Sequence, residues 1–210
     1  MTQKLQAPRA KFQEFREQLQ EQRWDDHRYY HHSLINQSLH CVSAITFIVA
    51  YAIVWREPAI AALLGWGVAM TARQAGHFFF EPLGYDHVND CTNEHKEEIK
   101  VGYNLFRKAV LTGLWVLLPV ALLIDPTFLG LFTAHTGVME FADHVGKLWL
   151  ALGVGGLLFR TVQLFIIRDV ETGLVWATKI ITDPFNDFRQ YRRAPAELTR
   201  QALAKLPLRR

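Results

Sequence analysis

Four apolar stretches dominate the hydrophobic pattern of the chain, and they cover residues 39–55, 58–72, 109–124 and 148–167. The first three contain no Asp, Glu, Lys or Arg, and the fourth contains only Arg160. Each stretch is apolar around its whole circumference, whereas a core helix of a soluble protein usually carries an apolar stripe. The pattern therefore predicts an all-α fold, an integral membrane bundle of about four transmembrane helices.

Polar residues gather at both ends of the chain and in one central segment. We expect a single membrane domain over residues 1–210, with a cytoplasmic N-terminal segment 1–38, a four-span region 39–167 that includes a cytoplasmic loop 73–108, and a cytoplasmic tail 168–210. Phe12, Phe15 and Leu19 are spaced as on one face of a helix, and so are the apolar residues within 174–181. Amphipathic terminal helices that rest against the membrane are therefore predicted.

Lys and Arg are distributed unevenly among the segments that join the apolar stretches. Twenty of them fall in residues 1–38, 73–108 and 168–210, whereas the other connections contain Arg56 and Lys147. Because cytoplasmic loops carry an excess of Lys and Arg, both termini and the central loop are predicted to be cytoplasmic, in a bacterial inner membrane or the endoplasmic reticulum. The net charge of +3 is too small and too dispersed for a nucleic-acid-binding protein. The basic segments beside the apolar stretches are instead expected to contact anionic head groups of membrane lipids.

Seven of the nine histidines fall on the predicted cytoplasmic side. His32, Asn36 and His40 recur every four positions, so on a helix they form one polar stripe. The stripe runs into the first apolar stretch, where an unpaired imidazole is costly. His77 and Glu81, which close the second stretch, are also four residues apart, and we expect them to lie opposite His40 across a tight helical hairpin.

These residue types are those of a metal site. Imidazoles with a carboxylate and open coordination positions suit non-haem iron(II). Glu81 is either a ligand itself or a group that orients His77, and the sequence favours neither role. His87 and His95 in the central loop are further candidate ligands. The run 94–100 is equally typical of an exposed helix with paired charges.

The two polar groups also resemble those of a known family. Residues 30–40 read Y-H-H-x-x-x-N-x-x-x-H, and residues 76–81 read G-H-x-x-F-E. Two such motifs in this order, each at a helix end, resemble the small membrane 2-hydroxy fatty acid dioxygenases, which include the fungal enzyme of phytosphingosine breakdown. The matching region, residues 29–82, is about a quarter of the chain.

The resemblance implies an iron(II)-dependent α-oxidation. A 2-hydroxy fatty acid and O2 are converted to a fatty acid one carbon shorter, with loss of the carboxyl carbon. The favoured iron ligands that it implies are His31 or His32, His40 and His77, with Asn36 and Glu81 at the other polar positions of the motifs.

The chemistry of such a substrate fits a site at the membrane boundary. A 2-hydroxy acid presents a carboxylate and a neighbouring hydroxyl, which together can chelate one iron. Arg73 lies one helical turn before His77, where its guanidinium can pair with the carboxylate. Arg28, Arg107 and Lys108 are alternative partners, and all four residues can equally be ordinary basic anchors. The acyl chain can stay between the helices while the head group meets the metal.

Two other classes of protein are compatible with the sequence. A di-iron hydroxylase or desaturase also modifies lipid at the cytoplasmic face, but such enzymes generally need tight HxxxH and HxxHH clusters, and no HxxHH occurs here. A non-enzymatic metal- or lipid-binding membrane protein is the other alternative. The sequence carries no signal for an oligomeric state.

Overall fold

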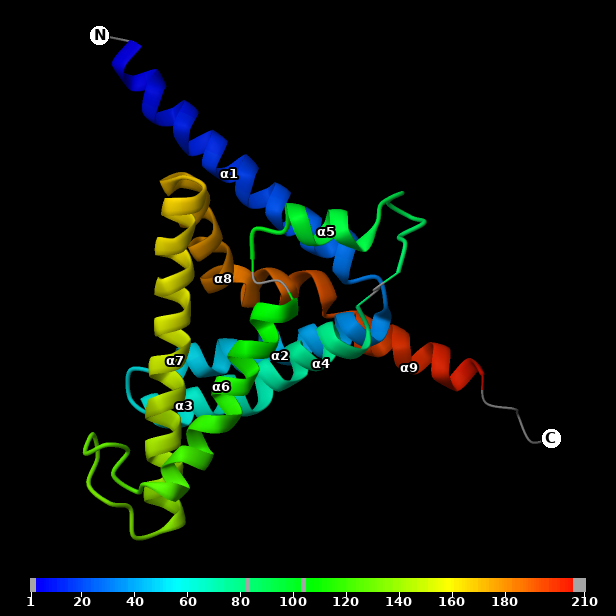
Figure 1. The fold of residues 1–210 in the computed structure, drawn as a ribbon. Helices are drawn as coiled ribbons and strands as arrows, with labels where there is room; N and C mark the ends of the chain where they lie inside the picture. The colour runs from blue at the N-terminus through cyan, green and yellow to red at the C-terminus, as the bar shows by residue number, and fades with distance from the viewer. Residues whose placement is uncertain (1–2, 82–83, 103–104, 206–210) are drawn as a thin grey trace, which may run out of the picture.

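A computed structural model of the chain describes residues 3–81, 84–102 and 105–205 (Figure 1). The helices in chain order are α1 (Gln3–Tyr30), α2 (Leu34–Ile53), α3 (Pro58–Leu64), the π-helix η1 (Gly65–Met70), α4 (Thr71–Phe79), α5 (Asn93–Ile99), α6 (Leu105–Ile124), α7 (Val138–Ile167), α8 (Val170–Tyr191) and α9 (Ala194–Ala204). Within these residues the only β-type pairing is an isolated bridge between Asp86 and Cys91. The predicted all-α fold is confirmed.

Three of the described helices are long and apolar enough to cross a membrane, namely Leu34–Ile53, Phe106–Ile124 and Val138–Ile167. The other expected span, 58–72, is divided between α3, η1 and the start of α4, which follow one another without a break. Membrane-spanning helices are thus confirmed, three by length and composition where about four were expected.

Large apolar side chains cover the outside of the long helices. Leu117 and Leu123 on α6, and Leu158 and Phe159 on α7, are all more than half exposed. An apolar surface of this extent is unfavourable in water but suits the hydrocarbon of a bilayer. The exposed side chains therefore support the membrane assignment independently of helix length.

Arg160 is the single charge of the fourth apolar stretch, and the structure explains how α7 accommodates it. Its side chain is buried, and its guanidinium donates to the carbonyl of Val101 at 2.6 Å and to Oε1 of Gln163 at 2.7 Å. Buried charges inside membrane helices need such partners. Arg160 thereby ties α7 to the segment that precedes α6.

The central helix of the arrangement is α2, which packs against α3, η1, α4, α8 and α9. It begins at Ser33, whose hydroxyl accepts a hydrogen bond from the backbone N–H of Asn36 at 3.0 Å. Pro58 then starts α3 after a short turn, which produces the expected hairpin (Figure 1). The hairpin brings α4 alongside the first turns of α2.

The tail helix α8 is amphipathic, but its polar face is directed into the protein. It packs against α1, α2 and α7, although the sequence had favoured a position under the membrane. Lys179, Asp183, Asp187 and Tyr191 are all buried on it and recur every four residues. This face of α8 reaches the same end of α2 as α4 does.

Candidate metal centre

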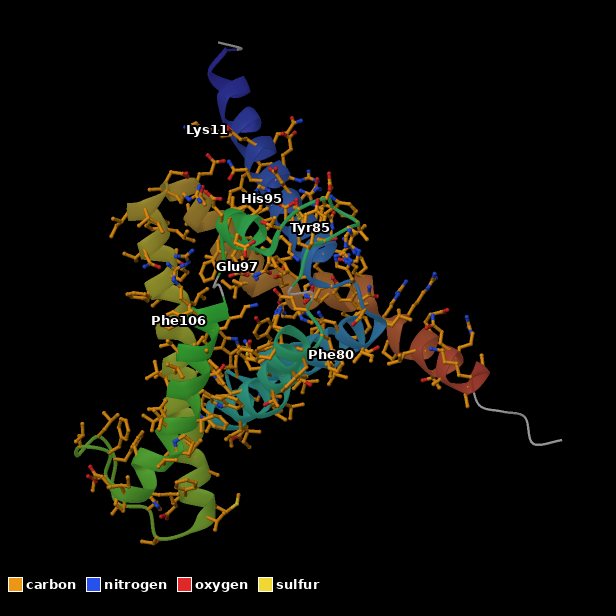
Figure 2. All side chains as sticks on the ribbon, turned by 45° about the vertical axis from the view of Figure 1, so that its right-hand side comes forward. Lys11, Phe80, Tyr85, His95, Glu97 and Phe106 are labelled. Atoms are coloured by element: carbon orange, nitrogen blue, oxygen red, sulfur yellow. The ribbon has the colours of Figure 1, made fainter. Side chains whose placement is uncertain are left out.

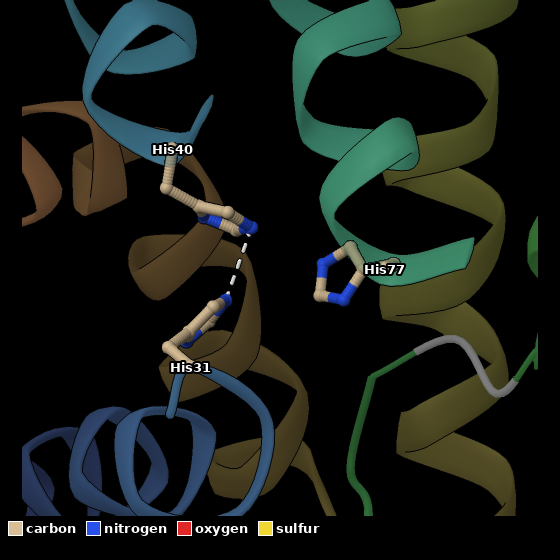
Figure 3. A group of neighbouring side chains, drawn as sticks. All are labelled: His31, His40 and His77. Atoms are coloured by element: carbon tan, nitrogen blue, oxygen red, sulfur yellow. Dashed lines mark hydrogen bonds between the residues drawn. The ribbon is translucent and has the colours of Figure 1, made fainter. Parts of the chain in front are cut away.

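Three buried histidines from separate segments converge at one point (Figure 3). His31 lies between α1 and α2, His40 is on α2 and His77 is on α4. One nitrogen of each lies within 4.8 Å of the others, and their exposed fractions are 4%, 0% and 7%. The Nε2 atoms of His31 and His40 face each other at 3.0 Å. Three imidazole nitrogens this close together are able to hold one metal ion.

The chemical state of the cluster suits a metal. Burial, reinforced by the neighbouring His40 ring, lowers the pKa of His31 well below its ordinary value. Its imidazole is therefore neutral at physiological pH, the form in which histidine binds metals. Nδ1 of His31 is buried and has no hydrogen-bond partner in the described structure. The donor set thus fits a metal that prefers imidazole, such as iron, zinc, copper or nickel.

Glu81 contacts His77 on the side away from the cluster. Its Oε2 accepts from Nδ1 of His77 at 2.6 Å, which leaves Nε2 of that ring available to an ion. Lys100 lies 3.5 Å and Lys108 4.0 Å from the same carboxylate. Burial raises the pKa of Glu81, although the two ammonium groups oppose the shift. Of the two roles that the sequence left open, the geometry supports orientation of His77.

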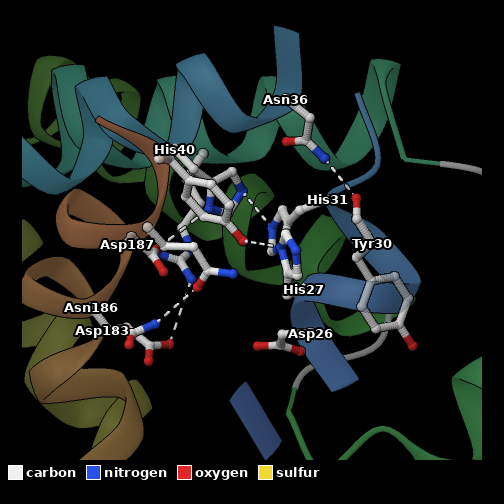
Figure 4. Close-up of polar contacts among 12 residues, drawn as sticks. Asp26, His27, Tyr30, His31, Asn36, His40, Asp183, Asn186 and Asp187 are labelled. Carbon is white, nitrogen blue, oxygen red and sulfur yellow. Dashed lines mark hydrogen bonds and ion pairs between the residues drawn. The ribbon is translucent and has the colours of Figure 1, made fainter. Parts of the chain in front are cut away.

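Asp187 of α8 lies behind His40 but does not make the hydrogen bond that Glu81 makes to His77 (Figure 4). Its Oδ2 lies 3.5 Å from Nδ1 of His40 and accepts a hydrogen bond from Arg73 at 3.1 Å. Arg73 also pairs with Asp183 at 3.7 Å. The sequence placed Arg73 opposite a substrate carboxylate, but in the structure two carboxylates of the protein already occupy its guanidinium.

Asn36 stabilises the turn between α1 and α2, which carries His31. Its Nδ2 donates to the carbonyl of Tyr30 at 2.8 Å, so the side chain links α2 to the last residue of α1 (Figure 4). Gly76 of α4 lies directly against it, because a Cβ there would overlap Oδ1 of Asn36 and lie 3.4 Å from the His40 ring. Asn36 therefore positions the backbone around the cluster, and its buried Oδ1 has no hydrogen-bond partner in the described structure.

The remaining candidate histidines lie outside the cluster in the described structure. His32 is exposed, with Nε2 3.5 Å from Oδ2 of Asp86, and His31 takes the inward position instead. His87 is also exposed, and its ring lies 5.0 Å from that of Tyr85. His95 is exposed on the short helix α5, near the surface in Figure 2, which agrees with the charged-helix interpretation of this run.

Further residues near the site were not singled out from the sequence. The phenol of Tyr191 lies 3.0 Å from Nδ1 of His27, and its ring is 5.6 Å from that of His31. Beside it, Lys179 pairs with Asp26 and, at 2.9 Å, with Asp183. The four-residue recurrence on α8 was the available signal, and it is the same pattern that identified the histidine stripe.

No protein-family model, curated protein or solved structure matches this chain. The identity of the site therefore depends on the geometry and chemistry of its own residues.

Proposed function

We propose that this protein is an iron(II)-dependent dioxygenase that converts a 2-hydroxy fatty acid and O2 to a fatty acid one carbon shorter. The observation that carries the proposal is the convergence of His31, His40 and His77 at the end of membrane helices. The resemblance of residues 29–82 to the membrane 2-hydroxy fatty acid dioxygenases supports the same reaction. We further propose that the site faces the cytoplasm, on the basis of the Lys and Arg distribution.

The residues of the chain divide the work of such a site between them. His31, His40 and His77 would hold the ion, while Glu81 fixes the ring orientation of His77 and Asp187 places a negative charge behind His40. When bound, iron(II) supplies the redox chemistry with O2 that oxidation of an unactivated 2-hydroxy acid requires. Atoms balance when the carboxyl carbon leaves as CO2 with one molecule of water.

The depth of the site suits a lipid substrate. The cluster is buried beside α2, a helix apolar enough to span a membrane, so an acyl chain can remain in an apolar environment while its polar head reaches the histidines. Burial also excludes water, which strengthens electrostatic interactions with a charged head group. These features favour an amphiphilic substrate over a small water-soluble acid.

The decisive experiment combines metal analysis with O2 uptake on the detergent-purified protein. Iron(II) and a long-chain 2-hydroxy fatty acid are supplied, and the same acid without the 2-hydroxyl group is the control. About one iron per chain with O2 consumption that depends on the hydroxyl group is the expected result.

Other results would replace the proposal. Two irons per chain would favour the di-iron hydroxylase class. An intact, metal-loaded site without O2 consumption would favour a non-enzymatic metal- or lipid-binding protein. Preferential binding of zinc would point to hydrolysis, since three histidines with an open position also form catalytic zinc sites.

A further inference from the structure

A cavity of about 390 Å³ lies next to the histidine cluster, between α1, α2, the helical run of residues 58–79, α6, α7 and α8. His77 lines it, and so do Lys100 and Lys108. Much of the remaining wall is apolar and includes Phe47, Ala62, Gly65, Trp66, Leu111 and Leu157. The cavity therefore joins a polar region at the candidate metal centre to an apolar region between membrane helices.

The helical run from α3 to α4 provides a scale for distances along the cavity. Trp66 and His77 both line it and are separated by eleven residues of continuous helix, which corresponds to a rise of about 16 Å. The hydrocarbon core of a bilayer is about 30 Å thick, so one leaflet is roughly half of that. The distance between these two side chains thus accommodates a large part of one long acyl chain.

At the polar end of the cavity, the ammonium group of Lys108 has fewer carboxylates close to it than that of Lys100. Lys100 lies within 3.5 Å of both Glu81 and Glu97 and also packs on the Tyr30 ring. The nearest carboxylate to Nζ of Lys108 is Glu81 at 4.0 Å, and no hydrogen bond from this ammonium is found in the described structure. Its side chain is only 12% exposed. A buried cation in this state favours an anionic ligand.

Trp66 is part of the apolar wall, between His77 and Ala61 along the helical run. Its side chain is buried, its ring stacks on Trp115 with centroids 6.0 Å apart, and α7 approaches it at Gly153. A Cβ at Gly153 would lie 3.3 Å from Nε1 of Trp66, so the indole has little room to move towards α7. A ligand chain that reaches this point therefore meets an indole that is held in place.

We propose that the cavity binds one single-chain lipid acid, whose carboxylate is bound by Lys108 beside His77 and whose chain ends against Trp66. This inference rests on the proposed function for the choice of an acid over other anionic lipids. It adds the residues that select the head group and the chain length, and it assigns the carboxylate to Lys108, because Arg73 is already paired with Asp183 and Asp187.

The head-group part is tested by binding, without turnover. The full-length protein in mild detergent is titrated calorimetrically with a saturated straight-chain fatty acid and with the primary alcohol of equal length. Lys108→Gln is expected to weaken acid binding about tenfold and to leave alcohol binding unchanged, because a charge-assisted hydrogen bond is lost. Lys108→Arg should retain acid binding. Arg107→Gln, which removes the same charge from the neighbouring exposed position, is the matched control.

Two results would overturn this assignment. One is undiminished acid binding by Lys108→Gln, and the other is an equal loss for acid and alcohol, which indicates general damage to the cavity. Thermal unfolding of each variant shows whether it is folded. If Lys108→Gln is unfolded, Lys108→Arg and the chain-length test below still decide the matter.

The chain-length part uses a series of saturated acids of increasing length. Trp66→Leu is expected to shift the tightest-binding acid to a longer chain, whereas Trp55→Leu, at the exposed tip of the hairpin, should not. An unchanged preference in Trp66→Leu would overturn the inference.

These measurements separate the inference from the proposed function. Since the probes lack the 2-hydroxyl group, selective acid binding can be found in a protein that does not oxidise 2-hydroxy acids, in which case only the proposed function fails. If the protein oxidises 2-hydroxy acids but the Lys108 and Trp66 variants bind fatty acids like the wild type, the roles of these two residues are contradicted. The proposed function is then unaffected.

Discussion

Oδ2 of Asp187, near the end of α8, lies 3.5 Å from Nδ1 of His40 in α2. The other ring nitrogen of His40 lies 3.0 Å from Nε2 of His31, inside the cluster. Nδ1 of His40 has no hydrogen-bond partner in the described structure, so Asp187 acts on the ring through its negative charge, which makes the nitrogen that faces the cluster a better metal ligand. The C-terminal tail therefore takes part in the candidate metal centre, although the motif residues all precede it.

Asp187→Asn is expected to weaken metal affinity about 10- to 100-fold while the protein stays folded, as is usual when such a supporting carboxylate is lost. Competition with a chelator of known affinity measures the change. Asp183→Asn is the matched control, because Asp183 also pairs with Arg73 but is not a partner of His40. Equal metal affinity in Asp187→Asn and the wild type would show that the 3.5 Å contact has no such role.

Single alanine substitutions should separate the converging histidines from the others. His40→Ala and His77→Ala are expected to abolish both bound metal and turnover, since each removes one of three ligands. His31→Ala should do the same. Metal content by mass spectrometry and O2 uptake are the measurements. The controls, which should keep their metal, are His32→Ala, His87→Ala and His95→Ala, and a metal-free control would add that residue to the site.

Gly76→Ala should disturb the site through packing alone. The added methyl group overlaps Asn36 and crowds the His40 ring, and overpacking of this kind costs about 1–3 kcal/mol. Lower stability and reduced metal content are expected together. Gly113→Ala on α6 meets no atom within 4 Å and should be neutral or slightly stabilising, because alanine favours helix over glycine. Equal thermal stability of the two variants would contradict the close α2–α4 packing.

Lys179 should make a pH-dependent contribution to stability. Burial alone would lower its pKa, but the carboxylates of Asp183 and Asp26 raise it above the ordinary value. A raised pKa means that the pair stabilises the folded protein fully below the unfolded value of about 10.4, and that this contribution disappears as the pH rises through the folded value.

Lys179→Met is therefore expected to lose about 3 kcal/mol at neutral pH, since it leaves buried carboxylates unpaired, and to lack the alkaline loss shown by the wild type. Denaturant unfolding at several pH values measures both effects. Lys147→Met removes an exposed pair with Asp143 and should cost less than about 1 kcal/mol. A variant with the wild-type alkaline profile would exclude Lys179 as the titrating group.

The apolar stretches were sufficient to predict an all-α membrane protein, because burial in lipid leaves a strong signal along the sequence. The second stretch was harder to interpret, since η1 separates two short helices and neither reaches the length of a span. The helix periodicity of residues 32–40 also led the sequence interpretation towards His32. In the structure α1 ends at Tyr30 and α2 begins at Leu34, so the intervening turn directs His31 inward instead.

The rest of the site depends on tertiary contacts that no local pattern specifies. The recurrence of Lys179, Asp183, Asp187 and Tyr191 indicates a polar helix face, but not that this face meets α2. Similarly, the spacing made His87 and His95 plausible ligands. In the structure both are exposed, in a loop that contains the isolated bridge between Asp86 and Cys91. Spacing therefore identified which helix faces are polar, and packing determined which of them meet.

The π-helix η1 contains Trp66 and directly precedes α4, which carries His77, and the hydroxyl of Thr71 at the start of α4 donates to the carbonyl of Gly67 in η1 at 2.8 Å. A π-helix accommodates one residue more than an α-helix of equal length. Deleting one residue from 65–70 would therefore convert this segment to ordinary α-helix and leave the direction of α4 relative to α3 nearly unchanged, whereas one further inserted residue would rotate α4 by about 100°. After such an insertion His77 would point away from its two partners. The extra residue of η1 thus leaves the histidine in phase with α3, and the segment should tolerate the loss of one residue more readily than the gain of one.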